Sequence, residues 1–120
     1  MKATLQGHPS AVEVVQRQLD AYNAHDLAAF VAMYADDIEV WRMPSTTPTI
    51  DGKPQLAEFY ATQRFCLPGL KADLVDRMAL GDKVIEHERV TGLSWQPTEV
   101  VVVYQVADGL IRRMWLFPPH

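Results

Sequence analysis

The order of helix and strand patterns along the chain predicts an α+β fold. Apolar residues recur at helical spacing mainly in the first half of the chain, whereas the segments from Lys71 onward have the patterns of strands. Helices followed by a run of strands are typical of an antiparallel sheet that carries helices on one face. With 120 residues, the chain is expected to form one domain that covers residues 1–120. A sheet that curls around its helices leaves a hollow in which a small molecule can bind.

Three helices are predicted in the first half of the chain. Ser10 and Glu13 have the spacing of a capping box, and an apolar helical repeat follows them. Asp26 is a candidate cap for a second helix, whose apolar face would extend to Tyr34. Pro54 suits the first turn of a third helix. We therefore expect helices at about residues 11–24, 27–35 and 54–66.

Five strands are predicted, one before the third helix and four after it. They are expected at residues 38–43, 71–80, 84–91, 99–107 and 110–117. Two turn signals, Gly81-Asp82 and Asp108-Gly109, separate strands in the second half, and Asp-Gly is a strong hairpin signal. The four consecutive valines at 100–103 predict a strand that is buried on both faces.

Composition and charge exclude several classes of function. The formal net charge is -4 and no basic stripe is present, so we expect no nucleic-acid partner. No apolar run approaches the ~20 residues of a membrane span, and the N-terminus lacks the apolar core of a signal peptide. We therefore expect a soluble, cytoplasmic protein. Cys66 has no cysteine partner and no Cys/His set has metal-ligand spacing, so neither a metal nor another cofactor is expected.

Several segments resemble the nuclear transport factor 2-like (NTF2-like) superfamily. They are YNAHDLAAFVAMYADDIEV, the proline-rich loop after it, DGKPQLAEFY, VIEHERVTG and VVVYQVADGLIRRMW. Members include ketosteroid isomerases, SnoaL-type polyketide cyclases and limonene-epoxide hydrolases. The resemblance covers about residues 12–117 and implies a cone, with three N-terminal helices packed on a curved mixed or antiparallel sheet around a hydrophobic pocket. Because the superfamily includes enzymes, binding modules and scaffolds, the resemblance is specific for the fold and leaves the activity open.

The isomerase residues are mostly replaced in this chain. Ketosteroid isomerases use a carboxylate base and an oxyanion hole made of a tyrosine and a protonated aspartic acid. The matching positions hold Gln18 for the first-helix tyrosine, Arg42 or Met43 for the base, and Val102 near the aspartic acid. Only the tyrosine of the third helix is matched, by Tyr60. Because a guanidinium, with a pKa above about 12, cannot accept a proton at pH 7, the isomerase chemistry does not carry over.

The epoxide hydrolase residues are also incomplete. The resemblance implies that Arg89 takes the place of that family's arginine. The two aspartates of the family fall on Thr91 and Leu116, and its water-holding pair falls on Val40 and Arg42. Without either carboxylate, the hydrolase reaction is not supported.

Strand alternation then predicts which side chains line the hollow. Because the family match turns Arg89 inward, Glu86 and Glu88 are expected to face away, as is Trp115 on the last strand. The inward set is then Ile85, His87, Arg89 and Thr91, with Val40, Arg42, Val100, Val102, Tyr104, Met114 and Leu116 on the neighbouring strands. A slip of one residue in register would exchange the two faces of a strand.

His87 and Arg42 are the candidate catalytic residues of this pocket. An unperturbed histidine titrates near 6.5, and beside two cations His87 would stay neutral and could act as a base. Arg42 and Arg89 would suit a carboxylate or enolate oxygen. The candidate substrate-binding residues are Arg89, Tyr104, Tyr60, Val40, Val102, Met114 and Leu116. The alternatives are that His87 only fills the pocket wall and that each arginine pairs with a neighbouring acid.

Two functions of different classes follow from this pattern. The first is a cofactor-free isomerase, cyclase or hydrolase that acts on an apolar carbonyl compound by proton transfer. The second is a non-catalytic ligand-binding or dimerisation module, which the missing carboxylates favour. The outward face of the sheet would carry Val101, Val103, Gln105 and Trp115, which are apolar enough to need covering, so a homodimer through this face is predicted.

Overall fold

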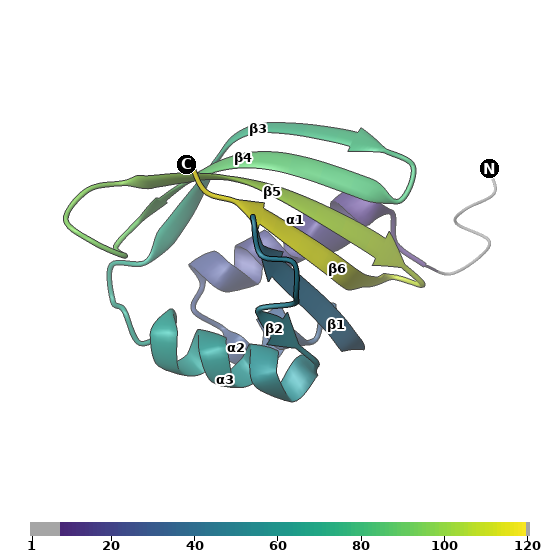
Figure 1. Cartoon of the computed structure of the whole chain (residues 1–120), viewed down its shortest axis with the longest axis horizontal. Coiled ribbons are helices and arrows are strands. Elements are labelled where there is room, and N and C mark those ends of the chain that lie inside the picture. Colours follow the sequence, from purple (N-terminus) through teal and green to yellow (C-terminus); the bar gives the residue numbers. More distant parts are fainter. Residues whose placement is uncertain (1–7, 120) are drawn as a thin grey trace.

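The computed structural model describes residues 8–119 and contains one six-stranded sheet with helices on its concave side (Figure 1). The elements are α1 (Ala11–Asn23), α2 (Leu27–Val31), β1 (Tyr34–Arg42), β2 (Ile50–Asp51), α3 (Lys53–Gln63), β3 (Lys71–Leu80), β4 (Lys83–Thr91), β5 (Thr98–Ala107) and β6 (Leu110–Phe117). Both the predicted α+β class and the helices packed on a curved sheet are confirmed.

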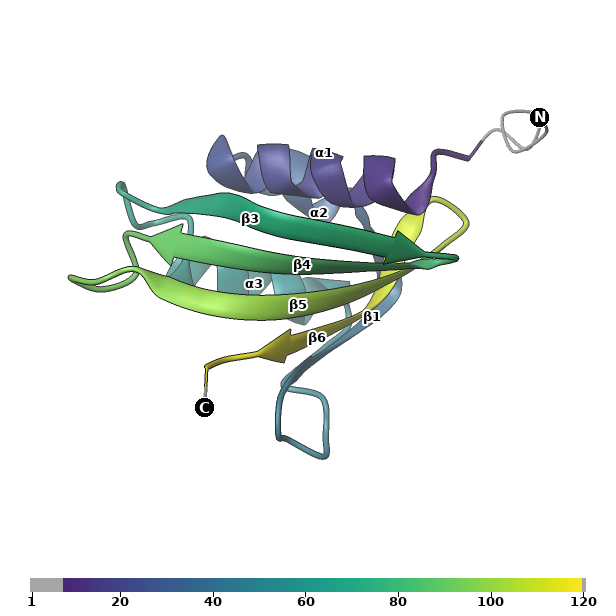
Figure 2. The same ribbon diagram turned by 90° about the horizontal axis from the view of Figure 1, so that it is seen from above.

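The sheet is mixed and joins the two halves of the chain. Its strand order is β2-β1-β6-β5-β4-β3, in which β1 runs parallel to β6 and all other neighbours are antiparallel. The early strand β1 is therefore held by the last strand. α1 packs against β3 to β6, whereas α3 packs against β1 and β2. Seen from above, α1 runs along the sheet beside β3 (Figure 2).

The helices begin within one residue of their predicted starts, but the second ends early and α3 ends at Gln63 instead of residue 66. The hydroxyl oxygen of Ser10 accepts from the Glu13 amide at 3.2 Å, and the Glu13 carboxylate accepts from the Ser10 amide at 2.9 Å. The predicted continuation of α2 to residue 35 is wrong, because Tyr34 already belongs to β1 and pairs with Ile111 of β6. Here strand pairing outweighs the helical spacing of the apolar residues. None of the helices within residues 8–119 is long and apolar enough to cross a membrane.

The later strands follow the prediction closely. β3 and β6 have the predicted bounds, and β4 and β5 each begin one residue earlier. Gly81 and Gly109 have φ values of 62° and 76°, which glycine adopts without the strain that a Cβ would cause. The two-residue strand β2 was not predicted, because it lies inside a segment rich in proline and threonine and is defined only by its pairing with β1.

The valine-rich strand β5 is buried on one face only. Val102 is 1% exposed and points to the helices, whereas Val101 is 40% exposed on the opposite face. The prediction of a strand buried on both faces is therefore wrong. The reason is that all three helices lie on the same side, and within the described residues no second layer covers the outer face.

Candidate functional site

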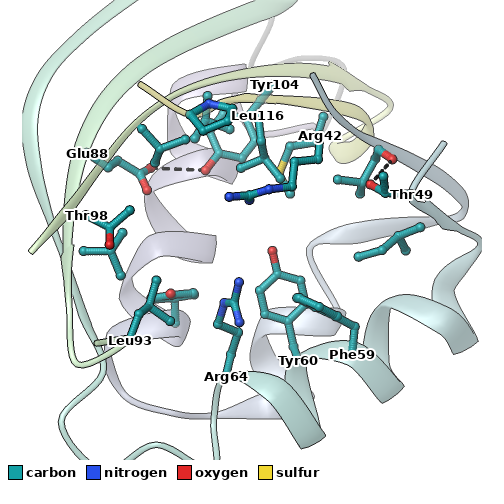
Figure 3. Close-up of a pocket in the computed structure, with 18 of the residues that line it drawn as sticks. Arg42, Thr49, Phe59, Tyr60, Arg64, Glu88, Leu93, Thr98, Tyr104 and Leu116 are labelled. Atoms are coloured by element: carbon teal, nitrogen blue, oxygen red, sulfur yellow. Dashed lines mark hydrogen bonds between the residues drawn. The ribbon is translucent and has the colours of Figure 1, made fainter. Parts of the chain in front are cut away.

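A cavity of about 200 Å³ lies between the concave face of the sheet and helices α1 and α3 (Figure 3). Most of its wall is apolar, and the apolar side chains are Leu19, Val40, Ile50, Phe59, Val90, Leu93, Val100, Val102, Met114, Leu116 and Pro118. It opens to solvent where the exposed residues Arg42 and Thr49 line it. An apolar cleft with a few polar groups is the usual form of a small-molecule site.

Two guanidinium groups and a phenol point into this cavity from different elements. Arg42 comes from the end of β1, Tyr60 from α3, and Arg64 from the residue that caps α3 (Figure 3). The Arg64 guanidinium carbon lies 4.9 Å from the centroid of the Phe59 ring, which supports its position by a cation–π contact. Burial raises the pKa of the Tyr60 hydroxyl to about 12, although the charges of Arg64 and Arg42 both act to lower it. One hydroxyl therefore lies within electrostatic range of both arginines.

Glu88 is the buried acid of the cavity, whereas Glu99, which also lines it, is partly exposed. Its carboxyl group is buried, and Oε2 accepts a hydrogen bond from the Tyr104 hydroxyl at 3.2 Å (Figure 3). Burial is the main reason that the pKa of Glu88 is raised to about 9, and the neighbouring Glu86 raises it further. Glu88 is therefore protonated at pH 7. The second-largest cause of the raised pKa is a hydrogen bond between the Glu86 and Glu88 side chains, so the proton of Glu88 lies within reach of both carboxyl groups.

Next to Glu88 on the same face, Glu86 forms a buried ion pair. Glu86 is completely buried, and its Oε2 accepts from Nε of Arg77 on β3 at 2.7 Å, with Nη2 2.6 Å away. Within the described residues its other oxygen, Oε1, accepts from no amide, guanidinium or hydroxyl group, whereas the Glu88 side chain is hydrogen-bonded to Glu86. Between β1 and α1, the Tyr34 hydroxyl donates to Gln18 Oε1 at 2.9 Å, and both side chains are buried. A buried polar layer thus lies alongside the apolar cavity.

The predicted face of β4 is wrong. Glu86 and Glu88 point to the helices, whereas His87 and Arg89 point outward. The cause is the register with β5, which places Glu86 directly opposite the buried Val102. Residues directly opposite each other in an antiparallel pair share a face, so all of β4 follows β5. The family match of Arg89, on which the prediction rested, does not describe this chain.

On the outer face, His87 and Arg89 form a small charged cluster with Glu99 of β5. His87 Nε2 is hydrogen-bonded to Glu99 Oε1, and Arg89 Nη2 lies 3.2 Å from Oε2. Hydrogen bonds from His87 and Arg89 hold the pKa of Glu99 below its usual value. Neither His87 nor Arg89 lines the cavity, so the roles predicted for them there lose their geometric basis. Ile85 and Thr91, also expected inside, share this outer face.

The other predicted site residues do line the cavity. They are Val40, Arg42, Tyr60, Val102, Tyr104, Met114 and Leu116. Sequence reasoning missed Arg64 and Glu88 and expected Glu88 outside. The signal for Glu88 was the hairpin register, since a strand with charges on both faces takes its orientation from its neighbour. Arg64 lies at the end of a helix with no local motif, and only the packing of α3 brings it to the cavity.

Metal-ligating side chains do not gather at this site. In the described part of the chain, no group of three His, Cys, Asp or Glu residues is arranged to hold a metal ion. Cys66 is exposed, and its thiol donates to the Thr62 carbonyl oxygen at 3.2 Å.

The sequence matches the SnoaL-like domain family over residues 15–114. No curated protein is similar enough to match the chain. Similar solved structures include an uncharacterised cystatin-fold protein from Novosphingobium aromaticivorans, with 23% identity and a TM-score of 0.81 over 90% of this chain and 97% of that one. A candidate ketosteroid isomerase from Kribbella flavida has 23% identity and a TM-score of 0.78 over 92% and 78% of the two chains.

An NTF2-like protein of unknown function from Cytophaga hutchinsonii has 11% identity and a TM-score of 0.77 over 98% of this chain and 94% of that one. At these identities the likeness shows the fold alone, and it confirms the predicted resemblance to NTF2-like proteins.

Proposed function

The chain belongs to the SnoaL-like domain family, and within that family we propose that it binds a small, largely apolar carbonyl compound in the cavity and transfers a proton to it through Glu88. The observation that carries this proposal is a buried carboxylic acid, protonated at pH 7, that faces an apolar cavity open to solvent. In this proposal Glu88 takes the place that sequence reasoning gave to His87.

The chemistry follows from the protonation state of Glu88. A neutral carboxyl group can donate to a carbonyl oxygen, which draws electron density from the neighbouring carbon atoms and makes their hydrogens more acidic. In this proposal a water molecule takes the carbon-bound proton while Glu88 protonates the oxygen, which gives an enol. In the reverse direction the carbon takes a proton from solvent, and the enol hydroxyl returns its proton to Glu88. Tyr104 holds Oε2 and so fixes the orientation of the acid. Arg42, Arg64 and Tyr60 lie around the same space and would stabilise negative charge that develops on the ligand.

Deuterium exchange provides the test of proton transfer. A panel of aliphatic and aromatic ketones is incubated with the protein in heavy water, and exchange next to the carbonyl is followed by proton NMR. We expect wild-type protein to accelerate exchange for at least one ketone and Glu88→Gln to slow it by about 100-fold, because general acid catalysis typically contributes this much. The matched variant His87→Gln changes the outward neighbour on the same strand and is expected to retain the rate.

Exchange that survives in Glu88→Gln would exclude Glu88 as the proton donor. Saturable binding of ketones without exchange would instead support the second candidate function, a non-catalytic binding module. This chain lacks the catalytic carboxylates at the positions where ketosteroid isomerases and limonene-epoxide hydrolases carry them, and that absence favours the binding module.

Assembly through the outer face of the sheet is a separate proposal. Val101 and Phe117 are each 40% exposed there. On the same face the rings of Trp41 and Trp115 are stacked, with their centroids 5.6 Å apart. Exposed apolar surface of this kind marks interaction sites, and a second copy of this chain would cover it. We expect a dimer by light scattering at micromolar concentration, and a monomer for Val101→Glu. A monomeric wild-type protein would exclude this dimer.

A further inference from the structure

We infer that the ligand of this cavity carries a carboxylate, held between Arg42 and Arg64, on an apolar body that extends toward Glu88. The inference rests on the proposed function in one respect, since it concerns the ligand of the same cavity. It adds the charge of the ligand and the residues that recognise it, neither of which the proton transfer requires.

The first argument is that these two arginines have no acidic partner. Elsewhere, four arginines form ion pairs, Arg77 with Glu86, Arg89 with Glu99, Arg112 with Asp37, and Arg113 with Glu39. Within residues 8–119, neither Arg42 nor Arg64 forms a salt bridge. In a chain with a net charge of -4, two guanidinium groups in one cavity lack an acidic partner among the described residues and can bind an anion, with Nη1 of Arg64 donating to the Gln63 carbonyl oxygen at 2.9 Å.

The second argument is that the acids of the cavity do not neutralise them. Glu88 is protonated at pH 7, and Glu99 is already bound to His87 and Arg89 on the outer face. The cavity is therefore positively charged at the side of Arg42 and Arg64. Such a field favours an anion. Because the cavity wall is largely apolar, water screens the attraction between the anion and the arginines only weakly.

The third argument is the arrangement of the donors. Arg42 and Arg64 enter from β1 and from the end of α3, so they approach the same space from opposite sides, with the Tyr60 hydroxyl between them (Figure 3). A carboxylate has two oxygens, each of which can accept from one guanidinium, and the phenol supplies a further donor. The rest of the wall is apolar, so the rest of the ligand must be apolar too.

A matched pair of probes tests this inference. 1-Naphthaleneacetic acid and 1-naphthaleneacetamide share an apolar ring and differ in charge at pH 7. Their binding is measured by titration calorimetry with wild-type protein, Arg42→Met, Arg64→Met and the control Arg17→Met, which removes an exposed arginine of α1 outside the cavity. The amide serves as an internal check, because its binding reports whether the cavity of each variant is intact.

We expect the wild-type protein to bind the acid roughly tenfold or more tightly than the amide, the usual effect of charged hydrogen bonds. Each cavity variant should lose most of this preference while it still binds the amide, and Arg17→Met should keep it. Added salt should weaken binding of the acid alone.

Equal affinities for acid and amide would overturn the inference and leave the neutral-ligand proposal intact. A preference for the acid that persists in both Arg42→Met and Arg64→Met would also overturn it. Failure of both probes to bind the wild-type protein would count against this inference and the proposed function together. Selective binding of the acid by a protein that exchanges no ketone hydrogens would refute proton transfer alone.

Discussion

Glu88 on β4 and Glu99 on β5 are two glutamates on neighbouring strands that face opposite sides of one sheet. The inner residue is buried and its pKa is raised to about 9, mainly by loss of water. The outer residue is half exposed, and hydrogen bonds from His87 and Arg89 lower its pKa. The same functional group is therefore an acid on one face and a solvated anion on the other.

This comparison shows what burial requires of a charged strand. On the inner face a buried negative charge must be removed or paired. Glu88 is protonated, and Glu86 forms an ion pair with a guanidinium group. On the outer face water solvates the charges, so the cluster of His87, Arg89 and Glu99 contributes little to stability. Burial on the inner face of β4 thus changes the protonation or the pairing of a glutamate.

The largest effect that would sharpen the comparison is a pH dependence of stability that originates from Glu88. The folded protein keeps this proton up to about pH 9, whereas the unfolded chain loses it near the ordinary value of 4.5. The folded state binds more protons in this window, so the free energy of unfolding falls as pH rises, by up to roughly 1.4 kcal/mol per pH unit. Urea unfolding across the window should show this slope in wild-type protein and not in Glu88→Gln. Equal slopes would mean that Glu88 titrates normally.

The next effect compares two arginines that pair with a glutamate directly across the sheet. Arg77 lies opposite Glu86, and Arg89 lies opposite Glu99. Arg77→Met leaves a fully buried carboxyl group without its partner and is expected to cost about 3 kcal/mol of unfolding free energy. Arg89→Met removes an exposed partner and should change that free energy little, as measured by urea unfolding at neutral pH. Similar losses in the two variants would contradict the contrast between the faces.

The smallest expected effect is that of His87. Because its ring points to the outer face, His87→Phe should change the affinity for 1-naphthaleneacetic acid by less than about twofold, the range of surface substitutions. Calorimetry beside wild-type protein measures this. A large loss of affinity with an intact fold would return His87 to the binding site.

The elements with local signals were predictable from the sequence. The capping box of Ser10 and Glu13 defines the start of α1, and the glycine-containing turns after Leu80 and Ala107 define the bounds of β3 and β6. The motifs of the NTF2-like superfamily added the overall arrangement, and the match over residues 15–114 agrees with it. These signals act between residues close in the chain, so they survive without tertiary context.

The sequence by itself therefore determined the α+β class, most element bounds and the apolar residues of β1, β5 and β6 that line the cavity. Only the tertiary structure decided the orientation of β4, where Val84 and Ile85 make both faces partly apolar and charges follow on each. The alternation of side chains along β4 defines two faces but not which of them is buried. The buried face is determined by the pairing of β4 with β5 and by the packing of α1 on the sheet. For the same reason Arg64 and Glu88 became visible as site residues only once the helices were packed on the sheet.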